Sequence, residues 1–227
     1  MNSALRHSAA HVFVESLEAP TPDPTDVHHL FRVLRLRDGE VVTVSDGAGG
    51  WRPMVVAGGA LEANGDIVRE PPPVQCTIAT AIPKGDRVEW MVQKLTELGV
   101  SEIVFLHCVH SVVRWDVARA AKQLERLARI AREASAQSRR VWLPVLRGPI
   151  SFDEAAALPG AVLADPDGPE VLRPSGISPL VVLIGPEGGF HQGELSVSML
   201  RRRLVDNVLR VETAAVAAAS VILTYPS

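Results

Sequence analysis

Two short stretches near the C-terminus place polar side chains where a ligand can meet the backbone. "LIGPEGGF" (183–190) leaves an apolar strand and enters a turn of three glycines with Glu187 in its middle. "VLRVETAA" (208–215) sets Arg210 and Glu212 between an apolar strand and an alanine-rich helix. Glycines let a ligand approach main-chain N–H and C=O groups, and open α/β sheets bind ligands at the carboxyl ends of their strands. Both stretches therefore indicate a ligand held by the backbone.

Each stretch also has a plainer structural interpretation. "GPEGG" alone fits a simple turn between a strand and a helix. Arg210 and Glu212 fit a surface arginine beside a helix cap, because Thr213 and a carboxylate near a helix start stabilise its N-terminus. These readings stay open on the local pattern alone.

The motifs of phosphate and metal binding are missing. No G-x-x-x-x-G-K-[ST] occurs, and "GAGGWR", the nearest approach to G-x-G-x-x-G, fails at its sixth position. A ligand at the glycine turn is therefore not gripped by its phosphates. "HCVH" brings His107, Cys108 and His110 together in sequence, but a strand sends neighbouring side chains to opposite faces, so we expect no metal there.

The basic residues are nearly all arginine and are clustered, although the chain carries a net charge of -3. The clusters are "FRVLRLR", the segment from Arg119 to Arg140, and "RRR" at 201–203. Solvated helix faces explain each cluster on its own. Such patches also bind phosphate in a protein of negative total charge, because salt screens each interaction beyond roughly 10 Å.

The first 70 residues have mostly the pattern of β-strands. "HVFVES" alternates, "EVVTVS" and "WRPMVVA" flank the turn "DGAGG" as a hairpin, and "DIVRE" adds a strand. One helix, capped by Thr25 or Asp26, interrupts them. Its apolar face carries Val27, Leu30, Phe31 and Leu34. Residues 1–70 are thus predicted to form a small β-barrel domain.

Three prolines at 71–73 read as a stiff linker, after which strands alternate with helices. The predicted strands are "CTIATAI", "EIVFLHC", "VWLPVL", "AVLAD" and "PLVVLIG". Helices are predicted from Asp86 to a stop at Gly99, over 116–137 and over 211–225. Inward residues of the first two are Val88, Met91, Val92, Leu95 and Leu98, then Val117, Leu124, Leu127, Ala131 and Ala134. Continuously apolar strands alternating with helices predict a parallel sheet covered on both faces over 74–227.

Composition places the chain among soluble globular proteins. It has 47% hydrophobic and 22% charged residues among 227, no apolar run that spans a bilayer, and a start without a signal peptide's apolar core. Cys76 and Cys108 are far apart, which indicates a reducing compartment without a disulfide framework. We expect a cytoplasmic protein.

Five motifs in order resemble the RsmE family, ribosomal RNA methyltransferases of the SPOUT superfamily. They are "HHLFRVLRLRDGEVVTVSDG", "VQKLTELGV", "QSRR…P", "LIGPEGGF…E" and "LRVETA", and they span nearly the whole chain. The resemblance implies an N-terminal PUA-like barrel over residues 1–70 and a SPOUT α/β domain over 74–227 whose chain forms a trefoil knot. It also implies a homodimer that uses S-adenosylmethionine to methylate N3 of one uridine in 16S RNA of the small ribosomal subunit.

The resemblance also assigns residues. "GPEGG", "VLRVETA" and "LADPDG" (163–168) would be the three knot loops around the cofactor. The implied cofactor-binding residues are Leu163, Ala164, Ile184, Gly185, Pro186, Glu187, Gly188, Gly189, Val208, Leu209 and Thr213. For methylation the N3 proton must leave, so Glu212 is the candidate base and Arg210 the candidate stabiliser of the uracil anion. Glu187 orients its loop or contacts the target.

RNA contacts are expected from arginines in both domains. His29, Arg32 and Arg35 lie at helical spacing beside the barrel and suit contacts with the phosphate backbone. Arg139 and Arg140 end the long helix and face RNA or the partner subunit's site.

The chain departs from the family pattern at Val205 and Asn207, where glycine and arginine are usual, and at Ala136, where glutamate is usual. Val205 would narrow the cofactor site. The alternatives are therefore a non-enzymatic RNA-binding protein on a degenerate SPOUT scaffold, or a SPOUT methyltransferase with another RNA target.

Overall fold

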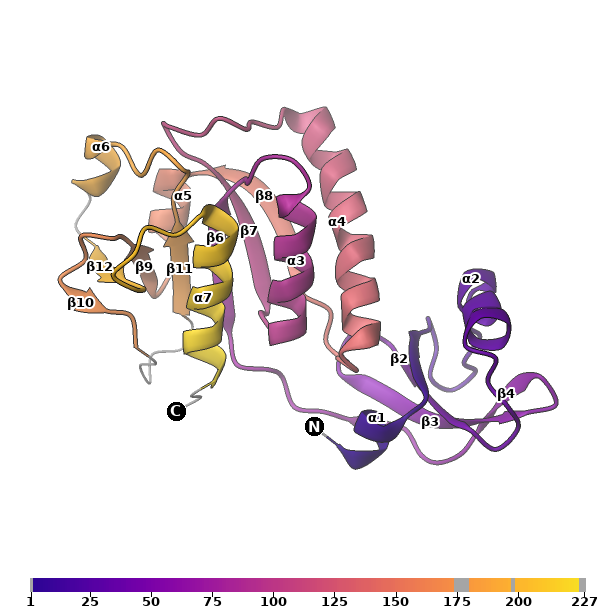
Figure 1. Ribbon diagram of the computed structural model, residues 1–227. Helices are drawn as coiled ribbons and strands as arrows, with labels where there is room; N and C mark the ends of the chain where they lie inside the picture. Colours follow the sequence, from indigo (N-terminus) through magenta and orange to yellow (C-terminus); the bar gives the residue numbers. More distant parts are fainter. Residues whose placement is uncertain (1, 174–179, 197–198, 225–227) are drawn as a thin grey trace. The chain divides into compact units, whose positions relative to one another are not determined.

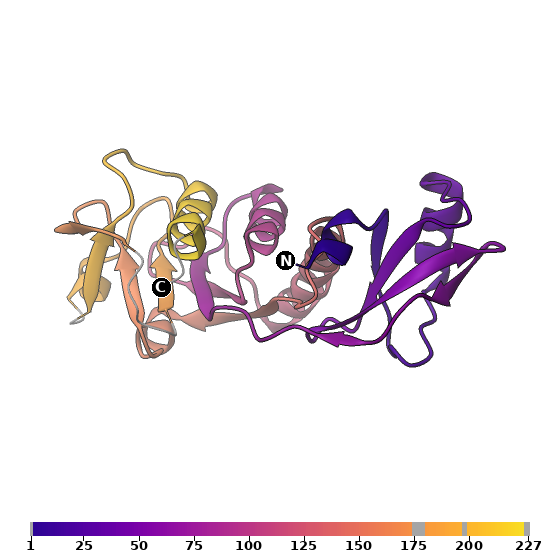
Figure 2. The ribbon, with the colours of Figure 1, turned by 90° about the horizontal axis from the view of Figure 1, so that it is seen from below.

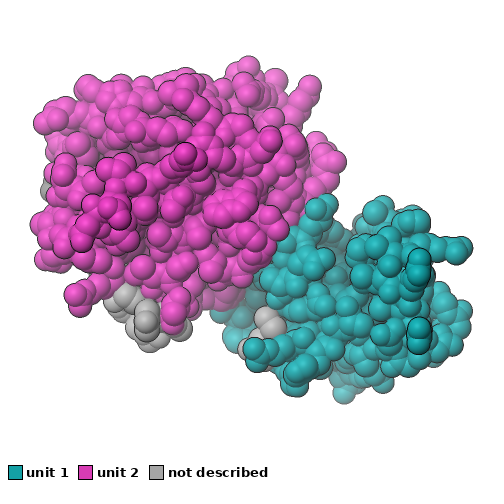
Figure 3. Space-filling view, in the orientation of Figure 1, with its two compact units in different colours: residues 1–72, 132–143 teal, residues 73–131, 144–227 magenta. Residues whose placement is uncertain are grey.

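The computed structural model describes residues 2–173, 180–196 and 199–224. The chain forms two compact units, coloured separately in Figure 3. Unit 1 comprises residues 1–72 and 132–143, and unit 2 comprises residues 73–131 and 144–227. The end of the long helix α4 (Val117–Gln137) and the segment after it therefore group with the N-terminal residues. Within the described residues, no helix is long and apolar enough to cross a membrane.

Unit 1 is built on a mixed five-stranded sheet. After the short helix α1 (Ser3–His7), its strands are β1 (Ala10–Phe13), β2 (Val41–Ser45), β3 (Gly50–Ala57), β4 (Ala60–Ala63) and β5 (Val68–Arg69). They follow the order β1-β2-β3-β4, with β5 also paired to β3 and the β1–β2 pair parallel. The predicted β-rich domain and its hairpin are confirmed, and β4 is a strand that was not predicted. Among the described strands, no pairing joins β1 to β4 or β5, so these pairings leave the sheet open.

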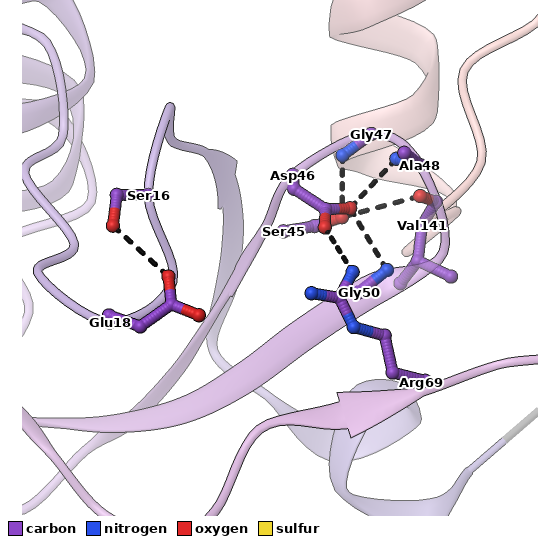
Figure 4. A network of polar contacts seen from close by, with 9 residues as sticks. All are labelled: Ser16, Glu18, Ser45, Asp46, Gly47, Ala48, Gly50, Arg69 and Val141. Atoms are coloured by element: carbon purple, nitrogen blue, oxygen red, sulfur yellow. Dashed lines mark hydrogen bonds and ion pairs between the residues drawn. The ribbon is translucent and has the colours of Figure 1, made fainter.

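The turn "DGAGG" of the β2–β3 hairpin is organised by one carboxylate. Asp46 Oδ1 accepts the N–H groups of Ala48 and Gly50 at 2.8 and 2.9 Å, and its Oδ2 lies 2.7 Å from Arg69 Nη1 (Figure 4). This local side-chain bonding is what makes aspartate favourable at the start of a turn. The hairpin is therefore held at its tip and tied to β5.

The predicted first helix differs from the observed one. Helix α2 (Pro24–His28) is capped by Asp23 rather than Thr25 or Asp26, and it continues as a π-helical turn, η1 (His29–Val33). The wider turn moves the side chain that follows it, Leu34, off the expected stripe, because it accommodates an extra residue. Of the predicted apolar face, Leu30 is buried and Phe31 is partly buried, whereas the other two are exposed: Val27 and Leu34.

Unit 2 contains a seven-stranded sheet in which every pair is parallel, as predicted. The strands are β6 (Cys76–Ala81), β7 (Glu102–His107), β8 (Val145–Ser151), β9 (Ala161–Ala164), β10 (Glu170–Val171), β11 (Leu180–Ile184) and β12 (Leu200–Arg203). Their order is β10-β12-β9-β11-β6-β7-β8. The last strand therefore inserts between two earlier ones, which places its loop beside those of β9 and β11.

Helices cover both faces of this sheet (Figures 1 and 2). On one face lie α3 (Arg87–Leu98), α4 and α7 (Val211–Thr224), packed against strand residues such as Ile78, Phe105 and Val182. On the other lies α5 (Phe152–Ala156), packed with Val104 and Leu183, and the short α6 (Gln192–Leu195) follows the β11 loop. Neighbouring strand residues join opposite cores, so the central strand β11 is apolar at every position.

Several predicted boundaries need correction. The strand expected at "VWLPVL" starts only at Val145, because residues 141–143 belong to unit 1. β10 and β12 were not predicted, since one is very short and the other carries Arg201, Arg202 and Arg203. The apolar strand expected before Arg210 is an irregular segment after β12.

The predicted helices α3, α4 and α7 are confirmed in type. Gly99 ends α3 with φ 99°, which suits a residue without a Cβ. Two predicted inward residues are wrong: Leu98 and Val117 lie at helix ends and are 37% and 89% exposed. The predicted strand "PLVVLIG" began at Pro179, and the predicted last helix ended at Tyr225. Both of these end residues lie outside the described residues.

Candidate active site

Three loops that follow β9, β11 and β12 converge on one cavity of about 310 Å³. All three leave the carboxyl ends of neighbouring parallel strands, where such sheets bind ligands. The start of α7 completes the wall. The lining residues are Ala164, Asp165, Pro166, Asp167, Ile184, Gly185, Pro186, Glu187, Gly189, Phe190, Leu195, Leu204, Val205, Asn207, Val208, Leu209, Val211 and Ala214.

The loop after β9 is fastened to β12. Asp165 is 7% exposed, and its Oδ2 accepts from Arg201 Nε at 2.6 Å and lies 2.5 Å from Arg201 Nη2. The Asp165 N–H donates to the Arg202 carbonyl at 2.9 Å. Gly168 passes so close that an added Cβ would lie 2.6 Å from the carbonyl carbon of Arg202. The "RRR" cluster thus lies in a strand, where Arg201 positions a cavity loop.

The glycine loop after β11 is held from two sides. Gly189 has φ 72°, and its N–H closes the turn by donating to the Pro186 carbonyl at 2.9 Å. Glu194 is 7% exposed and accepts the His191 N–H at 2.7 Å and the Val109 N–H at 2.9 Å. A buried carboxylate therefore ties this loop to the one that follows β7.

The segment after β12 leads into α7 with a carboxylate in its first turn. Glu212 is 6% exposed, and its Oε1 accepts from Arg87 Nη1 at 3.4 Å. Within the described residues, Glu212 Oε2 is buried and has no hydrogen-bond partner. Arg87 Nη2 also lies 4.0 Å from Glu187 Oε1 on the glycine loop. Arg210 is exposed and has no ion pair among the described residues, and its carbonyl accepts the Ala214 N–H at 2.8 Å.

Most of the predicted cofactor residues lie together in the cavity wall. Eight line it: Ala164, Ile184, Gly185, Pro186, Glu187, Gly189, Val208 and Leu209. The other three do not. Leu163 points into the core on the α5 side of the sheet, Gly188 faces His110 from outside the lining, and Thr213 is exposed on α7. Leu163 is absent from the cavity lining because side chains alternate along a strand, and its neighbour Ala164 is the one that faces the cavity.

Sequence reasoning missed Asp165, Phe190 and Arg87. Asp165 lies inside the quoted "LADPDG" and Phe190 inside "LIGPEGGF", so both stretches carried the signal. Arg87 carried none, because it is 125 residues away from its partner Glu212.

The predicted RNA-binding residues of unit 1 fall into two groups. His29, Arg32 and Arg35 are all exposed, and Arg35 follows η1 with φ 55°, so helical spacing does not extend to it. Arg139 and Arg140 are partly buried. Arg139 Nη2 donates to the Ser8 carbonyl at 3.0 Å, and Arg140 Nε donates to the Trp142 carbonyl. Burial lowers the pKa of Arg140 to about 10. Both guanidinium groups thus have partners within unit 1, and RNA contact by either stays a prediction.

The "HCVH" residues have separate partners. The Trp115 N–H donates to His107 Nε2, and His110 Nδ1–H donates to the Gly189 carbonyl. Burial raises the pKa of Cys108, and likewise of Cys76, to about 12, so neither thiol is poised as a nucleophile. Within the described part of the chain, no three His, Cys, Asp or Glu side chains gather as a metal site.

A larger cavity of about 530 Å³ lies at the opposite, amino ends of the strands, beside Ala161, Leu180 and Leu200. None of the predicted site residues is among its described lining residues. The carboxyl-end cavity is therefore the candidate site.

Comparison with known proteins supports the same assignment. A model of an RNA methyltransferase domain matches residues 70–223, and a model of an RNA methyltransferase PUA domain matches residues 22–58. Ribosomal RNA small subunit methyltransferase E of Bacillus subtilis is 31% identical and covers 90% of each chain. Its counterpart in Mycobacterium bovis is 31% identical over 86% of this chain and 82% of its own. The Neisseria gonorrhoeae counterpart, solved bound to S-adenosyl methionine, superposes with a TM-score of 0.74 at 26% identity over 94% and 96% of the chains.

A parallel sheet with a three-loop cavity at its carboxyl edge, preceded by a PUA domain, defines an RNA methyltransferase of the SPOUT class. The chain belongs to the ribosomal RNA small subunit methyltransferase E family.

Proposed function

We propose that this protein uses S-adenosylmethionine to methylate N3 of one uridine in 16S RNA of the small ribosomal subunit. The observation that carries the proposal is the cavity at the carboxyl edge of the sheet, where three backbone loops meet beside Glu212 and Arg87. Relatives that match most of the chain are named ribosomal RNA small subunit methyltransferase E.

The cavity wall fits an adenosyl cofactor. Apolar side chains such as Ile184 and Leu209 suit an adenine ring, and loop backbone offers N–H and C=O groups to its edge. Asp167 and Glu187 place carboxylates beside a ligand that carries a sulfonium cation and ribose hydroxyls. Gly189 leaves open space where a side chain would intrude. The described lining residues include no lysine.

When bound, S-adenosylmethionine would supply a methyl group on a positively charged sulfur, so that a new N3–C bond would replace the S–C bond. Glu212 accepts the N3 proton of the uracil, because its Oε2 is a buried acceptor without a partner in the described structure. Arg210 stabilises the negative charge that develops on the uracil oxygens. Glu187 orients the glycine loop against the target base.

Residues 1–70 form the RNA-positioning domain, and residues 74–227 form the catalytic domain with its knot. His29, Arg32 and Arg35 are exposed on unit 1 and bind phosphates, which positions the RNA without reading its sequence. A uridine in folded RNA is flipped out before its N3 meets the site. We further propose that the protein acts in the cytoplasm as a homodimer.

A degenerate, non-catalytic scaffold is the competing function, motivated by Val205 and Asn207. Both line the cavity, yet about 310 Å³ stays open with Val205 in its wall. The open cavity favours cofactor binding, and therefore favours a catalytic protein over a non-catalytic scaffold.

Labelled-methyl transfer tests the proposed substrate. Small and large ribosomal subunits that lack this methylation are each incubated with the protein and methyl-labelled S-adenosylmethionine. We expect label in 16S RNA of small subunits only. Label confined to large-subunit RNA would move the protein to another target, and absence of transfer together with absence of cofactor binding would favour the scaffold.

A further inference from the structure

The first residue of α3 reaches two carboxylates from different parts of the candidate site. Arg87 Nη1 bonds Glu212 Oε1 at 3.4 Å, and its Nη2 lies 4.0 Å from Glu187 Oε1. Its Nε donates to the Lys84 carbonyl at 3.1 Å, which fixes the plane of the guanidinium. One side chain thus connects α3, the glycine loop of the cavity and the start of α7.

Glu212 needs this partner because it is buried. Its side chain is 8% exposed, and Arg87 is the one cation that pairs with it among the described residues. An ionised carboxylate removed from water costs several kcal/mol unless it is paired. Arg87 therefore offsets the cost of burying the Glu212 carboxylate, and it occupies one carboxylate oxygen.

The other oxygen of Glu212 is left free of hydrogen bonds within the described structure. Buried acceptors almost always have a donor, so each unpaired one calls for an explanation, and Glu212 Oε2 is the one that lies in the first turn of α7 beside the cavity. A carboxylate held at Oε1 by a fixed guanidinium presents Oε2 in one orientation. The N3–H group of a uracil is a hydrogen-bond donor of the kind that Glu212 Oε2 lacks.

We infer that Arg87 is the positioning residue of the methyl transfer: it pairs with the buried Glu212 carboxylate and fixes the orientation of its free oxygen, and it also approaches Glu187 on the cofactor loop. This inference rests on the proposed function and adds a residue that none of the sequence motifs assigned a role. Arg87 acts through the two glutamates and does not itself touch the methyl group.

A double-mutant cycle on turnover tests it. Arg87→Met alone should lower kcat at saturating RNA by roughly 10²-fold, the lower range for a lost acid–base contribution. Affinity for S-adenosylmethionine should change less than about threefold, because Arg87 does not line the cavity and its ion pair with the lining residue Glu187 is 4.0 Å long and partly exposed. Arg87→Lys should recover part of kcat, since it restores the charge without the fork. In a Glu212→Gln background, Arg87→Met should lower kcat by less than about threefold more.

The matched control is Arg126→Met, which removes another arginine that pairs with α3, at Glu89, and contacts none of the site residues. It should leave kcat unchanged. Arg87→Met with normal kcat would overturn the inference, and so would losses that multiply in the double variant. Either result leaves the methylation itself standing, whereas a wild-type protein without transfer removes the proposed function.

Unfolding equilibria supply a readout that does not need activity. Arg87→Met leaves Glu212 buried without its cation and should raise the unfolding constant by about tenfold, a value reduced for the partial exposure of Arg87. Adding Glu212→Gln should reverse most of that change. Equal unfolding constants for wild type and Arg87→Met would show that the pair does not hold Glu212, and the inference would fail.

Discussion

At the residue scale, the proposed chemistry depends on one carboxylate. Glu212→Gln keeps the size of the side chain but removes the proton acceptor, so turnover should fall by roughly 10²–10⁴-fold. Cofactor affinity should persist, because Glu212 is not part of the cavity lining. Steady-state kinetics and calorimetric titration measure the two quantities. Glu97→Gln, on the surface of α3, is the control. Undiminished turnover in Glu212→Gln would assign the proton to another group.

Arg210 is predicted to act on charge rather than on binding. Arg210→Ala should reduce kcat at saturating RNA by roughly 10²–10³-fold, as for a lost donor to a developing anion. The structure gives it no ion pair among the described residues, so little stability should be lost. Normal turnover together with weaker RNA binding would instead make it a phosphate contact.

A buried histidine in unit 1 predicts a pH effect on stability. Burial, aided by the charge of Arg139, lowers the pKa of His11 to about 3. The folded state thus favours the neutral ring, so stability is full above pH 6.5 and is lost as the pH falls toward 3. The slope should approach 1.4 kcal/mol per pH unit within that window.

Urea unfolding of His11→Asn between pH 7 and pH 4.5 checks this prediction. The variant should show a flatter dependence of its unfolding free energy on pH. The exposed His28→Asn serves as control and should keep the wild-type slope. If His11→Asn kept the wild-type slope, the pH dependence of the unfolding free energy would not come from His11.

At the element scale, three loops must approach one another closely. Gly168→Ala would place a methyl group 2.6 Å from the backbone of Arg202, so the loop after β9 must move off β12. Overpacking of this kind costs roughly 1–3 kcal/mol, and we expect a comparable loss of cofactor affinity. Calorimetric titration measures it. The control is Gly193→Ala, whose added methyl group would meet only the imidazole of His191, at 3.3 Å, and this variant should bind the cofactor normally. If Gly168→Ala bound the cofactor as tightly as wild type, the close contact between Gly168 and Arg202 would not be needed to shape the cavity.

The elements also mark what the sequence could and could not predict. Apolar strands such as β6 and β11 and the amphipathic α3 follow from residue pattern alone, because burial decides them. Strand β12 could not be predicted, since its arginines find partners far away in sequence, at Asp165 and Glu170. The π-helical turn η1 could not be predicted either, because the residue pattern of 25–34 also fits an ordinary α-helix.

At the scale of the whole molecule, the two units should divide the work. Arg32→Ala combined with Arg35→Ala should weaken RNA binding and lower the salt slope by roughly one for each lost phosphate contact. Cofactor affinity should be unchanged, because these residues lie in unit 1 and the cavity residues lie in unit 2. Filter binding across salt concentrations measures the slope. Arg69→Ala, whose side chain already pairs with Asp46, is the control. Identical slopes before and after the double change would contradict the division.

The architecture of unit 2 was predicted from alternating strands and helices, but its order of strands was not. Insertion of β12 between β9 and β10 brings distant segments together. Eight predicted cofactor residues meet there because motifs marked the loops, while Arg87 needed the structure to be found.

The central claim is methylation of uridine at N3. Small subunits that lack this methylation are incubated with the protein and S-adenosylmethionine, and their 16S RNA is digested to nucleosides for mass spectrometry. We predict one equivalent of 3-methyluridine, reduced in parallel with turnover in Glu212→Gln. Methylation that appears only on ribose or on another base would contradict the account.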